Sequence, residues 1–411
     1  MFGRGYTPTE ESAMSTPTRP GDPREIATTL LSLGATSYGG PAIMGVMQAE
    51  LQDRRKWVSK ERFLEGLAVA NMLPGATATQ LGIFLAYARG GWWGGLLGGL
   101  CFVGPAFVIM LALTIAYATL GVTPLARGAL YGLGPVVIAL FALALYRLGK
   151  TAASSVPEAI IGIAAAAAAV TSRVGIVAIL VLAGCAGLIA FHRGPSRARA
   201  SALATLTVVA VVAIVWRTSS SAGGSVAGWI PDRMSLVDLG LYFLEVGAFT
   251  IGGGLTMIAF IQEQVVGQFG WLTPREFVDG LALGQLTPGP VLMIAAYVGY
   301  KLAGVAGAAV AAGAAFLPSF VIMLAILPVL DRVRQLAWVK AVMRGMSPAV
   351  IGVLAVSLAR LAPAAVPDVF ALAILVGAIV AALALRVGAF KLMLGGAVLG
   401  LLRSQLLQAR P

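Results

Sequence analysis

Glycine and proline interrupt two apolar stretches in each half of this sequence, at points where helical hydrogen bonding has to stop. The breaks are Ser37-Tyr38-Gly39-Gly40-Pro41 and Leu73-Pro74-Gly75-Ala76-Thr77 in the first half, and Thr250-Ile251-Gly252-Gly253-Gly254 and Thr287-Pro288-Gly289-Pro290 in the second. Proline removes a backbone donor, and glycine permits a sharp turn and a close approach of the backbone. A helix that begins after such a break has free N–H groups and a partial positive charge at its N-terminus. It can therefore bind an oxyanion without a buried Lys or Arg.

Polar side chains near the breaks could add hydrogen-bond donors to such a site. The candidate substrate-binding residues are Ser37, Gly39, Gly40, Pro74, Gly75, Thr77, Gln80, Thr250, Gly252, Gly253, Gln285, Thr287, Pro288 and Gly289. The alternative is that glycine and proline only kink the helices, which is common in membranes. We favour a binding site because the breaks occur as two pairs in matching positions.

Four carboxylates lie inside apolar segments or at their ends and are candidates for proton coupling: Glu50, Glu65, Glu263 and Asp279. A carboxylate at membrane depth is a functional candidate by default, and carrying protons is its usual role. The alternative places all four at the membrane interface, solvated or paired with Arg62 or Arg275. The sequence leaves both interpretations open.

The composition indicates that these elements lie in a membrane. Of the 411 residues, 59% are hydrophobic and 11% are charged, whereas a soluble domain normally has about 25% charged residues. Soluble enzymes and nucleic-acid binders are therefore excluded. The net charge of +12 arises from short basic runs between apolar stretches, where basic loops set membrane orientation. Strand-type alternation is absent, so we predict an all-α polytopic inner-membrane protein.

Thirteen apolar stretches can be distinguished, and most approach the roughly 20 residues that a spanning helix needs. The first begins near residue 26, and the others cover about 63–88, 92–120, 128–148, 156–172, 174–191, 202–216, 236–262, 277–300, 303–330, 341–361, 368–386 and 388–402. We expect a disordered, cytoplasmic tail over 1–25 and two repeats over 26–192 and 236–403. Between them we expect a linker over 193–235 with an extra transmembrane helix at about 202–216, and after them a tail over 404–411.

The two halves are copies of one another. A shift of 213 residues aligns Gly34 with Gly247, and Pro105 with Pro318; one inserted residue between these points aligns Trp57 with Trp271 and Pro74-Gly75 with Pro288-Gly289. Tryptophan and proline are too rare for such matches to arise by chance in apolar sequence. We call residues at equivalent positions of the two copies repeat mates.

The second copy is expected to be inverted in the membrane. Six stretches in the first copy and one between the copies make an odd number of crossings, and inverted repeats of this kind build secondary transporters with a midplane substrate site. If the first two stretches of each copy are re-entrant hairpins, the basic segment 54–62 moves to the inner side. The positive-inside rule favours this version, and both versions leave the second copy inverted.

Other classes of protein fit less well. A polytopic membrane enzyme needs acidic metal-binding clusters in its loops, and only scattered acidic residues are found, so we expect no enzyme activity. His192 is the only histidine, which predicts no metal site and no cofactor. A channel would share the repeat and the broken helices, and the sequence does not separate it from a carrier.

The motifs together resemble the chromate ion transporter family. The first copy has Gly34, Gly39-Gly40-Pro41-Ala42, Trp57-Val58-Ser59, Phe63, Pro74-Gly75 with Gln80, and Gly104-Pro105-Ala106-Phe107. The second copy has Gly247 to Gly254, Trp271-Leu272-Thr273, Thr287-Pro288-Gly289-Pro290 and Phe316-Leu317-Pro318-Ser319-Phe320. The pattern covers about 26–402. Two positions depart from it: Ile43-Met44 stand where a histidine is frequent, and Glu245 stands where a basic residue is frequent.

The resemblance implies a two-domain protein of the bacterial inner membrane, with its copies in opposite orientation, that exports chromate, driven by the proton motive force, and so confers chromate resistance. Sulfate is the obvious structural analogue of chromate, and exchange of sulfate or another oxyanion is the alternative. The expected partners are the inorganic oxyanion and the lipid bilayer, with a homodimer as one assembly to consider and no nucleic acid.

Overall fold

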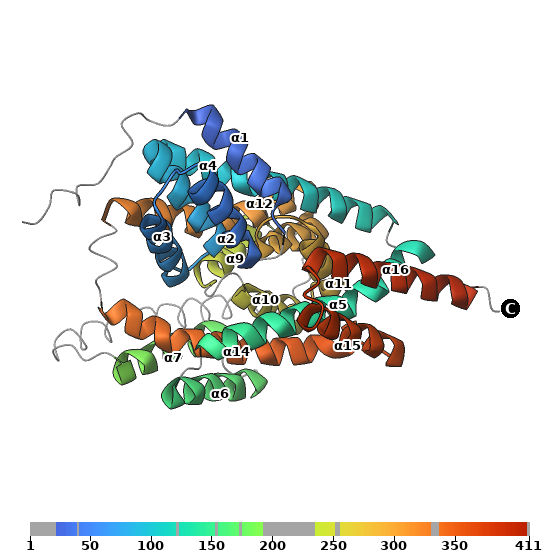
Figure 1. Cartoon of the computed structure of the whole chain (residues 1–411). Helices are drawn as coiled ribbons and strands as arrows, with labels where there is room; N and C mark the ends of the chain where they lie inside the picture. Colours follow the sequence, from blue (N-terminus) through green and yellow to red (C-terminus); the bar gives the residue numbers. More distant parts are fainter. Residues whose placement is uncertain are drawn as a thin grey trace, which may run out of the picture.

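The computed structural model describes residues 22–38, 41–120, 123–152, 155–171, 175–191, 235–250, 255–329 and 337–408, and every regular element within them is a helix (Figure 1). The first copy contains α1 (Pro23–Thr36), α2 (Pro41–Met47), the π-helix η2 (Gln48–Arg54), α3 (Lys60–Met72), α4 (Thr77–Leu120), α5 (Pro124–Ala152), α6 (Val156–Thr171) and α7 (Ile176–Phe191). The second contains α9 (Leu236–Ala248), α10 (Leu255–Ile261), the π-helix η4 (Gln262–Gln268), α11 (Pro274–Leu286), η5 (Val291–Met293), α12 (Ile294–Ile326), η6 (Leu327–Val329), α14 (Ala337–Ala365), α15 (Val369–Leu383) and α16 (Ala389–Gln408). The predicted all-α class is confirmed.

The same helices recur in the same order in both copies. Each copy has a short α-helix that continues directly into a seven-residue π-helix, η2 in the first and η4 in the second. Positive φ angles also recur at repeat mates, with +125° at Gly75 and +99° at Gly289, and with +64° at Gly91 and +62° at Gly304. The repeat found in the sequence is therefore present in the backbone.

The long helices α4 and α12 each reverse direction near one end. At Gly90 and Gly91 the backbone leaves the helical region, and Ala303 and Gly304 do the same in the second copy. A Cβ placed on Gly98 would lie 2.4 Å from the Cβ of Ala86, although twelve residues span about 18 Å in a straight helix. Each element is therefore a hairpin with a short first arm and a long second arm.

Several helices are long and apolar enough to cross a bilayer. They are Thr77–Leu120, Pro124–Lys150, Val291–Val329 and Ala337–Ala365, with shorter apolar helices at Val156–Thr171, Ile176–Phe191 and Val369–Ala384. The chain is thus a multi-pass membrane protein. By contrast, α3 and the first arm of α4 (77–89) have thirteen residues each and are about 20 Å long, short of the ~30 Å hydrocarbon core.

The two copies exchange their last helices. Within each copy α1 packs along α4 and α9 packs along α12, but α16 of the second copy packs along α5 of the first, and α14 packs against α6 and α7 (Figure 1). Glycines allow these crossings to be close. A Cβ on Gly132 would lie 1.9 Å from the carbonyl oxygen of Gly396, and a Cβ on Gly345 would lie 2.1 Å from that of Ala183. The copies therefore interlock through paired small-residue faces.

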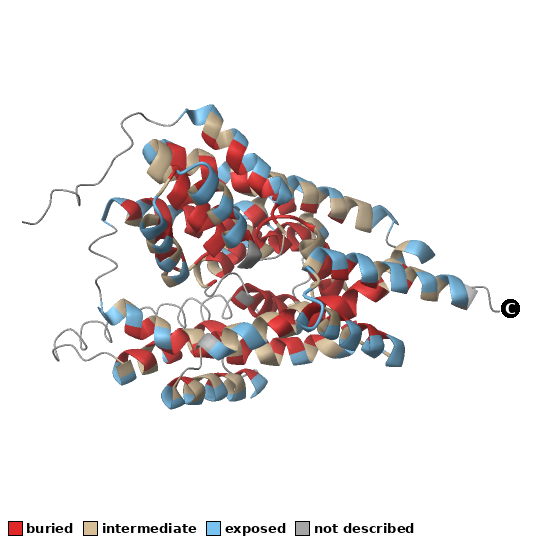
Figure 2. Ribbon diagram, viewed as in Figure 1, coloured by how far each residue is buried: buried red, intermediate tan, exposed pale blue. Residues whose placement is uncertain are grey.

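Buried residues lie on the helix faces that point toward neighbouring helices, and large apolar side chains are also exposed on the outside (Figure 2). Ile163 on α6, Leu182 on α7 and Val376 on α15 are among the large exposed apolar side chains. Such a surface is unfavourable in water, and in a bilayer it is solvated by acyl chains.

Some predicted features lie outside the described residues. They are most of the N-terminal tail, the extra helix at about 202–216 with most of its linker, and the four glycines Gly39, Gly40, Gly252 and Gly253. At the C-terminus α16 continues to Gln408, so the helix extends into the predicted tail. At the other end α1 begins at Pro23, with the Asp22 side chain accepting a hydrogen bond from the Arg24 N–H as its cap.

Candidate functional site

The breaks of one copy bond to the breaks of the other. The N–H of Gly289 donates to the carbonyl of Ser37 at 2.8 Å, and the N–H of Gly75 donates to the carbonyl of Thr250 at 2.6 Å. Ser37 and Thr250 are repeat mates, and so are Gly75 and Gly289. The first break of each copy therefore contacts the second break of the other, and the two bonds form a reciprocal junction at the interface between the copies.

Glycine is required at the second break for two independent reasons. The positive φ angles of Gly75 and Gly289 lie in a region that residues with a Cβ rarely adopt. A Cβ on Gly75 would also lie 2.5 Å from Ser319 Oγ, and one on Gly289 would lie 2.8 Å from the Cβ of Ala106. Ala106 and Ser319 are themselves repeat mates on the long arms of α4 and α12, so each break rests on the other copy's long arm.

The two halves of this junction differ at two positions, and the two differences compensate each other. The N–H of Ala76 donates to Ser319 Oγ at 2.8 Å in a buried setting. The mate of Ala76 is Pro290, which has no N–H, and the mate of Ser319 is Ala106, which has no hydroxyl. Both halves thus avoid an unpaired buried donor. Ser319 was not identified as a site residue from the sequence. The differences between mates at Ala76 and Pro290, and at Ser319 and Ala106, could have indicated it.

Unused polar atoms around the junction lie mainly in the first copy. Ser37 and Thr79 are buried, and their hydroxyls have no hydrogen-bond partner, nor has Gln80 Oε1. Gln80 Nε2 instead donates to the carbonyl of Pro74 at 2.7 Å. The hydroxyls of Thr250 and Thr287 donate to helix carbonyls four residues earlier. Of these four hydroxyls, those of Ser37 and Thr79 are therefore free to donate to a bound group.

The remaining candidates occupy different positions around the breaks. Thr77 is buried at the first residue of α4, Pro288 is buried, and Pro74 and Gln285 are half-buried. Gly39, Gly40, Gly252 and Gly253 fall between described residues, immediately before α2 and α10. The junction therefore brings together Ser37, Gly75, Thr250 and Gly289 directly.

The candidate carboxylates differ sharply in burial. Asp279 is 6% exposed; its Oδ1 lies 3.2 Å from Arg275 Nε, an ion pair without hydrogen-bond alignment. The hydroxyl of Tyr117 donates to its Oδ2 at 3.2 Å. Its mate Glu65 has a side chain 33% exposed and pairs with Arg62 at 2.9 Å. Pairing with Arg62 and Arg275 is therefore observed, but only in the second copy is the carboxylate buried.

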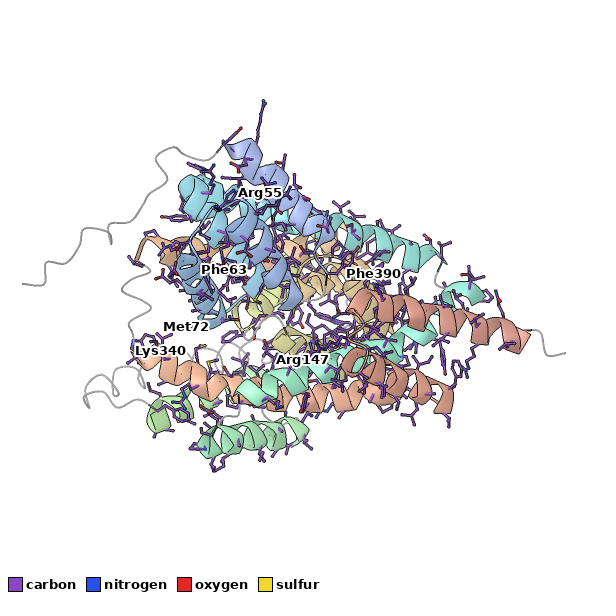
Figure 3. The ribbon with its side chains drawn as sticks, viewed as in Figure 1. Arg55, Phe63, Met72, Arg147, Lys340 and Phe390 are labelled. Carbon is purple, nitrogen blue, oxygen red and sulfur yellow. The ribbon has the colours of Figure 1, made fainter. Side chains whose placement is uncertain are left out.

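The other pair lies in the two π-helices. Glu50 accepts from Arg54 at 3.1 Å and from Arg55 at 2.6 Å, and Figure 3 shows Arg55 beside α1. Glu263 is buried, with Gln268 Nε2 at 3.5 Å from its Oε1. Among the described residues no group of three His, Cys, Asp or Glu side chains is placed to hold a metal ion.

Comparisons with known proteins agree with this architecture. The family model described as Chromate transporter matches the chain twice, over 24–188 and 237–401. A probable chromate transport protein of Synechococcus elongatus is 34% identical over 307 residues, covering 73% of this chain and 74% of the relative.

Two further relatives are chromate transport proteins. The one from Cupriavidus metallidurans is 30% identical over 357 residues, or 84% of each chain. The one from Pseudomonas aeruginosa is 32% identical over 328 residues, covering 79% of this chain and 77% of the relative. No solved structure matches the chain. Matches to both copies, with these relatives, establish that the chain belongs to the chromate transporter family.

Proposed function

We propose that this protein moves chromate across the bacterial inner membrane and that the junction between the breaks is its oxyanion site. The reciprocal bonds between Ser37 and Gly289 and between Thr250 and Gly75 carry the proposal. They hold four helix breaks together at the interface of two copies, which is where secondary transporters bind their substrates.

The chemistry of the junction suits a tetrahedral dianion. The helix α4 begins at Thr77, directly after the Gly75 turn, so its first N–H groups are at the junction. The free hydroxyls of Ser37 and Thr79 are further donors. Because helix N-termini favour negative charge, these groups can replace part of the hydration shell of chromate. Sulfate has the same shape and charge and is the alternative substrate.

We assign proton coupling to Asp279 rather than to Glu65. Asp279 is enclosed by Arg275 and by Tyr117 from the long arm of α4, whereas Glu65 forms a half-exposed ion pair. A buried carboxylate in contact with both copies can couple protonation to their relative movement. Glu50 and Glu263 remain secondary candidates.

The proposed topology is inverted, with a cytoplasmic N-terminus and re-entrant first hairpins. The lengths of α3 and of the first arm of α4, about 20 Å each, support half-crossings that meet at the Gly75 break. The exchanged packing of α16 on α5 and of α14 on α7 supports an approximate twofold relation between the copies. Outward transport of chromate and assembly as a homodimer belong to the same proposal.

The test is chromate and sulfate flux into proteoliposomes, with and without an imposed pH gradient, for the wild type, Asp279→Asn and Glu65→Gln. We expect gradient-driven chromate accumulation to fall at least tenfold in Asp279→Asn and less than twofold in Glu65→Gln. Chromate–chromate exchange without a gradient should persist in Asp279→Asn, which shows that the protein is folded.

Other outcomes would change specific parts of the proposal. Equal losses in both carboxylate variants would remove the assignment to Asp279. Sulfate exchange without any dependence on the gradient would remove proton coupling and make the protein an oxyanion exchanger. Flux that does not saturate with chromate concentration would indicate a channel.

A further inference from the structure

An open groove of about 420 Å³ lies between the start of α5 and the end of α16, away from the junction. Its floor is formed by a close crossing, because a Cβ on Gly400 would lie 2.1 Å from the carbonyl oxygen of Gly128. Arg127, Tyr131, Arg403 and Ser404 line it. In Figure 1 this region is where α5 and α16 extend together toward the C-terminus.

The groove carries a net positive charge on a rigid wall. Arg403 is fixed in place by an ion pair with Asp368 at 2.6 Å and by stacking of its guanidinium 4.0 Å from the Tyr131 ring centroid. A guanidinium has five N–H donors, so Arg403 keeps donors that Asp368 does not use. Arg127 on the opposite wall is exposed. Together Arg127, Arg403 and Asp368 leave one positive charge uncompensated.

Large exposed apolar side chains lie close to this basic centre in the sequence. Leu120, Leu125, Leu402 and Leu406 flank the groove along the chain and are 57%, 63%, 51% and 69% exposed. In a membrane these side chains contact acyl chains, while arginine near a helix end is at headgroup level. A free inorganic anion would gain nothing from the leucines. A phospholipid would contact the arginines with its headgroup and the leucines with its acyl chains.

The equivalent place in the other half of the molecule has different residues. The mate of Ser404 is Phe191, whose ring lies 4.1 Å from the guanidinium carbon of Arg344, and the mate of Arg403 is Ala190. The mate of Arg127 is Lys340, an exposed cation at the far end of α14 that Figure 3 labels on the opposite side of the molecule. Lys340 therefore serves as a control cation at the equivalent position of the other copy.

We infer that the groove between α5 and α16 binds the phosphate headgroup of an anionic phospholipid, with Arg127 and Arg403 contacting the phosphate and the flanking leucines contacting the acyl chains. Basic pockets between transmembrane helices recognise anionic headgroups in this way. This inference is independent of chromate transport, because none of its residues belongs to the junction.

The test is native mass spectrometry of the purified full-length protein after addition of phosphatidylglycerol or phosphatidylcholine. The wild type should retain phosphatidylglycerol at least fivefold better than phosphatidylcholine. Arg127→Ala should lose most of this preference, and Lys340→Ala should keep it within twofold. Ser404→Phe, which places the side chain of the other half in the groove, should also lose it; if that variant does not fold, Arg127→Ala alone decides.

A second arm separates the lipid from a free anion. Inorganic phosphate at millimolar concentration should not displace phosphatidylglycerol from the wild type. Displacement by phosphate, or binding of phosphate alone that disappears in Arg127→Ala, would overturn the lipid assignment in favour of an inorganic anion site. Equal loss of lipid in Arg127→Ala and Lys340→Ala would show non-specific attraction and would also overturn it.

Discussion

At the scale of single residues, the hydroxyl of Ser319 shows how the two copies have diverged while keeping one geometry. It accepts the N–H of Ala76 beneath the Gly75 turn, and the other half has neither the donor nor the acceptor, because Pro290 and Ala106 take these places. A buried N–H that loses its partner costs about 1–3 kcal/mol. The stability of the junction should therefore depend on Ser319 and not on Ala106.

We predict that Ser319→Ala lowers the free energy of unfolding by about 1–3 kcal/mol because the Ala76 N–H loses its acceptor. Adding Ala76→Pro recreates the pairing of the other half and should recover most of this loss. Thermal unfolding in detergent measures both effects. Ala106→Ser is the control and should not raise the stability, since it faces a proline that has no N–H to donate to the new hydroxyl. If Ala76→Pro makes Ser319→Ala worse, the compensation inferred from the mates is wrong.

Residue types alone predicted the breaks but not their partners. The glycines at 75 and 289 are required by the local backbone conformation, so the breaks can be recognised from the sequence. The bond from Gly289 to Ser37 depends on how distant helices pack, and no local signal specifies that. Asp279 and Glu65 look equivalent as repeat mates. They differ because Tyr117, whose hydroxyl contacts Asp279, comes from another helix and has Leu330 as its mate.

At the scale of helices, glycines at the crossing points allow α16 to pack closely on α5 and α14 on α7. The sequence predicted helices from apolar length, and it identified the two copies. It did not predict that α16 packs on α5, because a repeat in sequence says nothing about which copy contributes each packing partner. The reversals at Gly91 and Gly304 agree with the predicted boundaries near residues 90 and 303.

We predict that Gly132→Ala separates α5 from α16 and strongly destabilises the protein, since its Cβ would lie 1.9 Å from a backbone oxygen, which cannot move without shifting the helix. Gly395→Ala is the control, because a Cβ there has nothing within 4 Å. It should be neutral or stabilise by up to about 1 kcal/mol, as alanine favours helix. Folded yield after purification and the thermal midpoint report both variants. Similar values for the two would argue against a close α5–α16 crossing.

At the scale of the whole molecule, two clusters connect the copies, each made of an acid, an arginine and an aromatic ring. In one, Arg344 of α14 pairs with the buried Glu158 of α6 at 2.7 Å and stacks on Phe191. In the other, Arg403 pairs with Asp368 and stacks on Tyr131. In both clusters the arginine belongs to the second copy and the ring to the first, whereas the acid belongs to the first copy in one cluster and to the second copy in the other.

We predict that Arg344→Ala destabilises the association of α14 with α6 by about 2 kcal/mol. Removing one partner of a wholly buried pair costs about 3–5 kcal/mol, and the half-exposed Arg344 reduces this. Arg344→Lys keeps the charge but loses the stacked, planar contact, so it should fall between the wild type and alanine. Urea unfolding followed by tryptophan fluorescence measures the differences. An alanine variant as stable as the wild type would mean that Glu158 is satisfied by other groups.

The second cluster should make stability depend on pH. Asp368 precedes α15 and lies outside the spanning helices, and hydrogen bonds from the Tyr131 hydroxyl and the Ala371 N–H, together with Arg403, hold the pKa of its carboxyl below the ordinary value. A lowered pKa in the folded state means that its stabilising effect is complete above the ordinary pKa of about 4 and is lost as the pH falls through the folded value. The thermal midpoint of the wild type should therefore exceed that of Asp368→Asn at pH 7, and the difference should shrink steadily on acidification below about pH 4. A difference that grows with acidification would show that the carboxylate destabilises the interface, and would exclude this cluster as a connection between the copies.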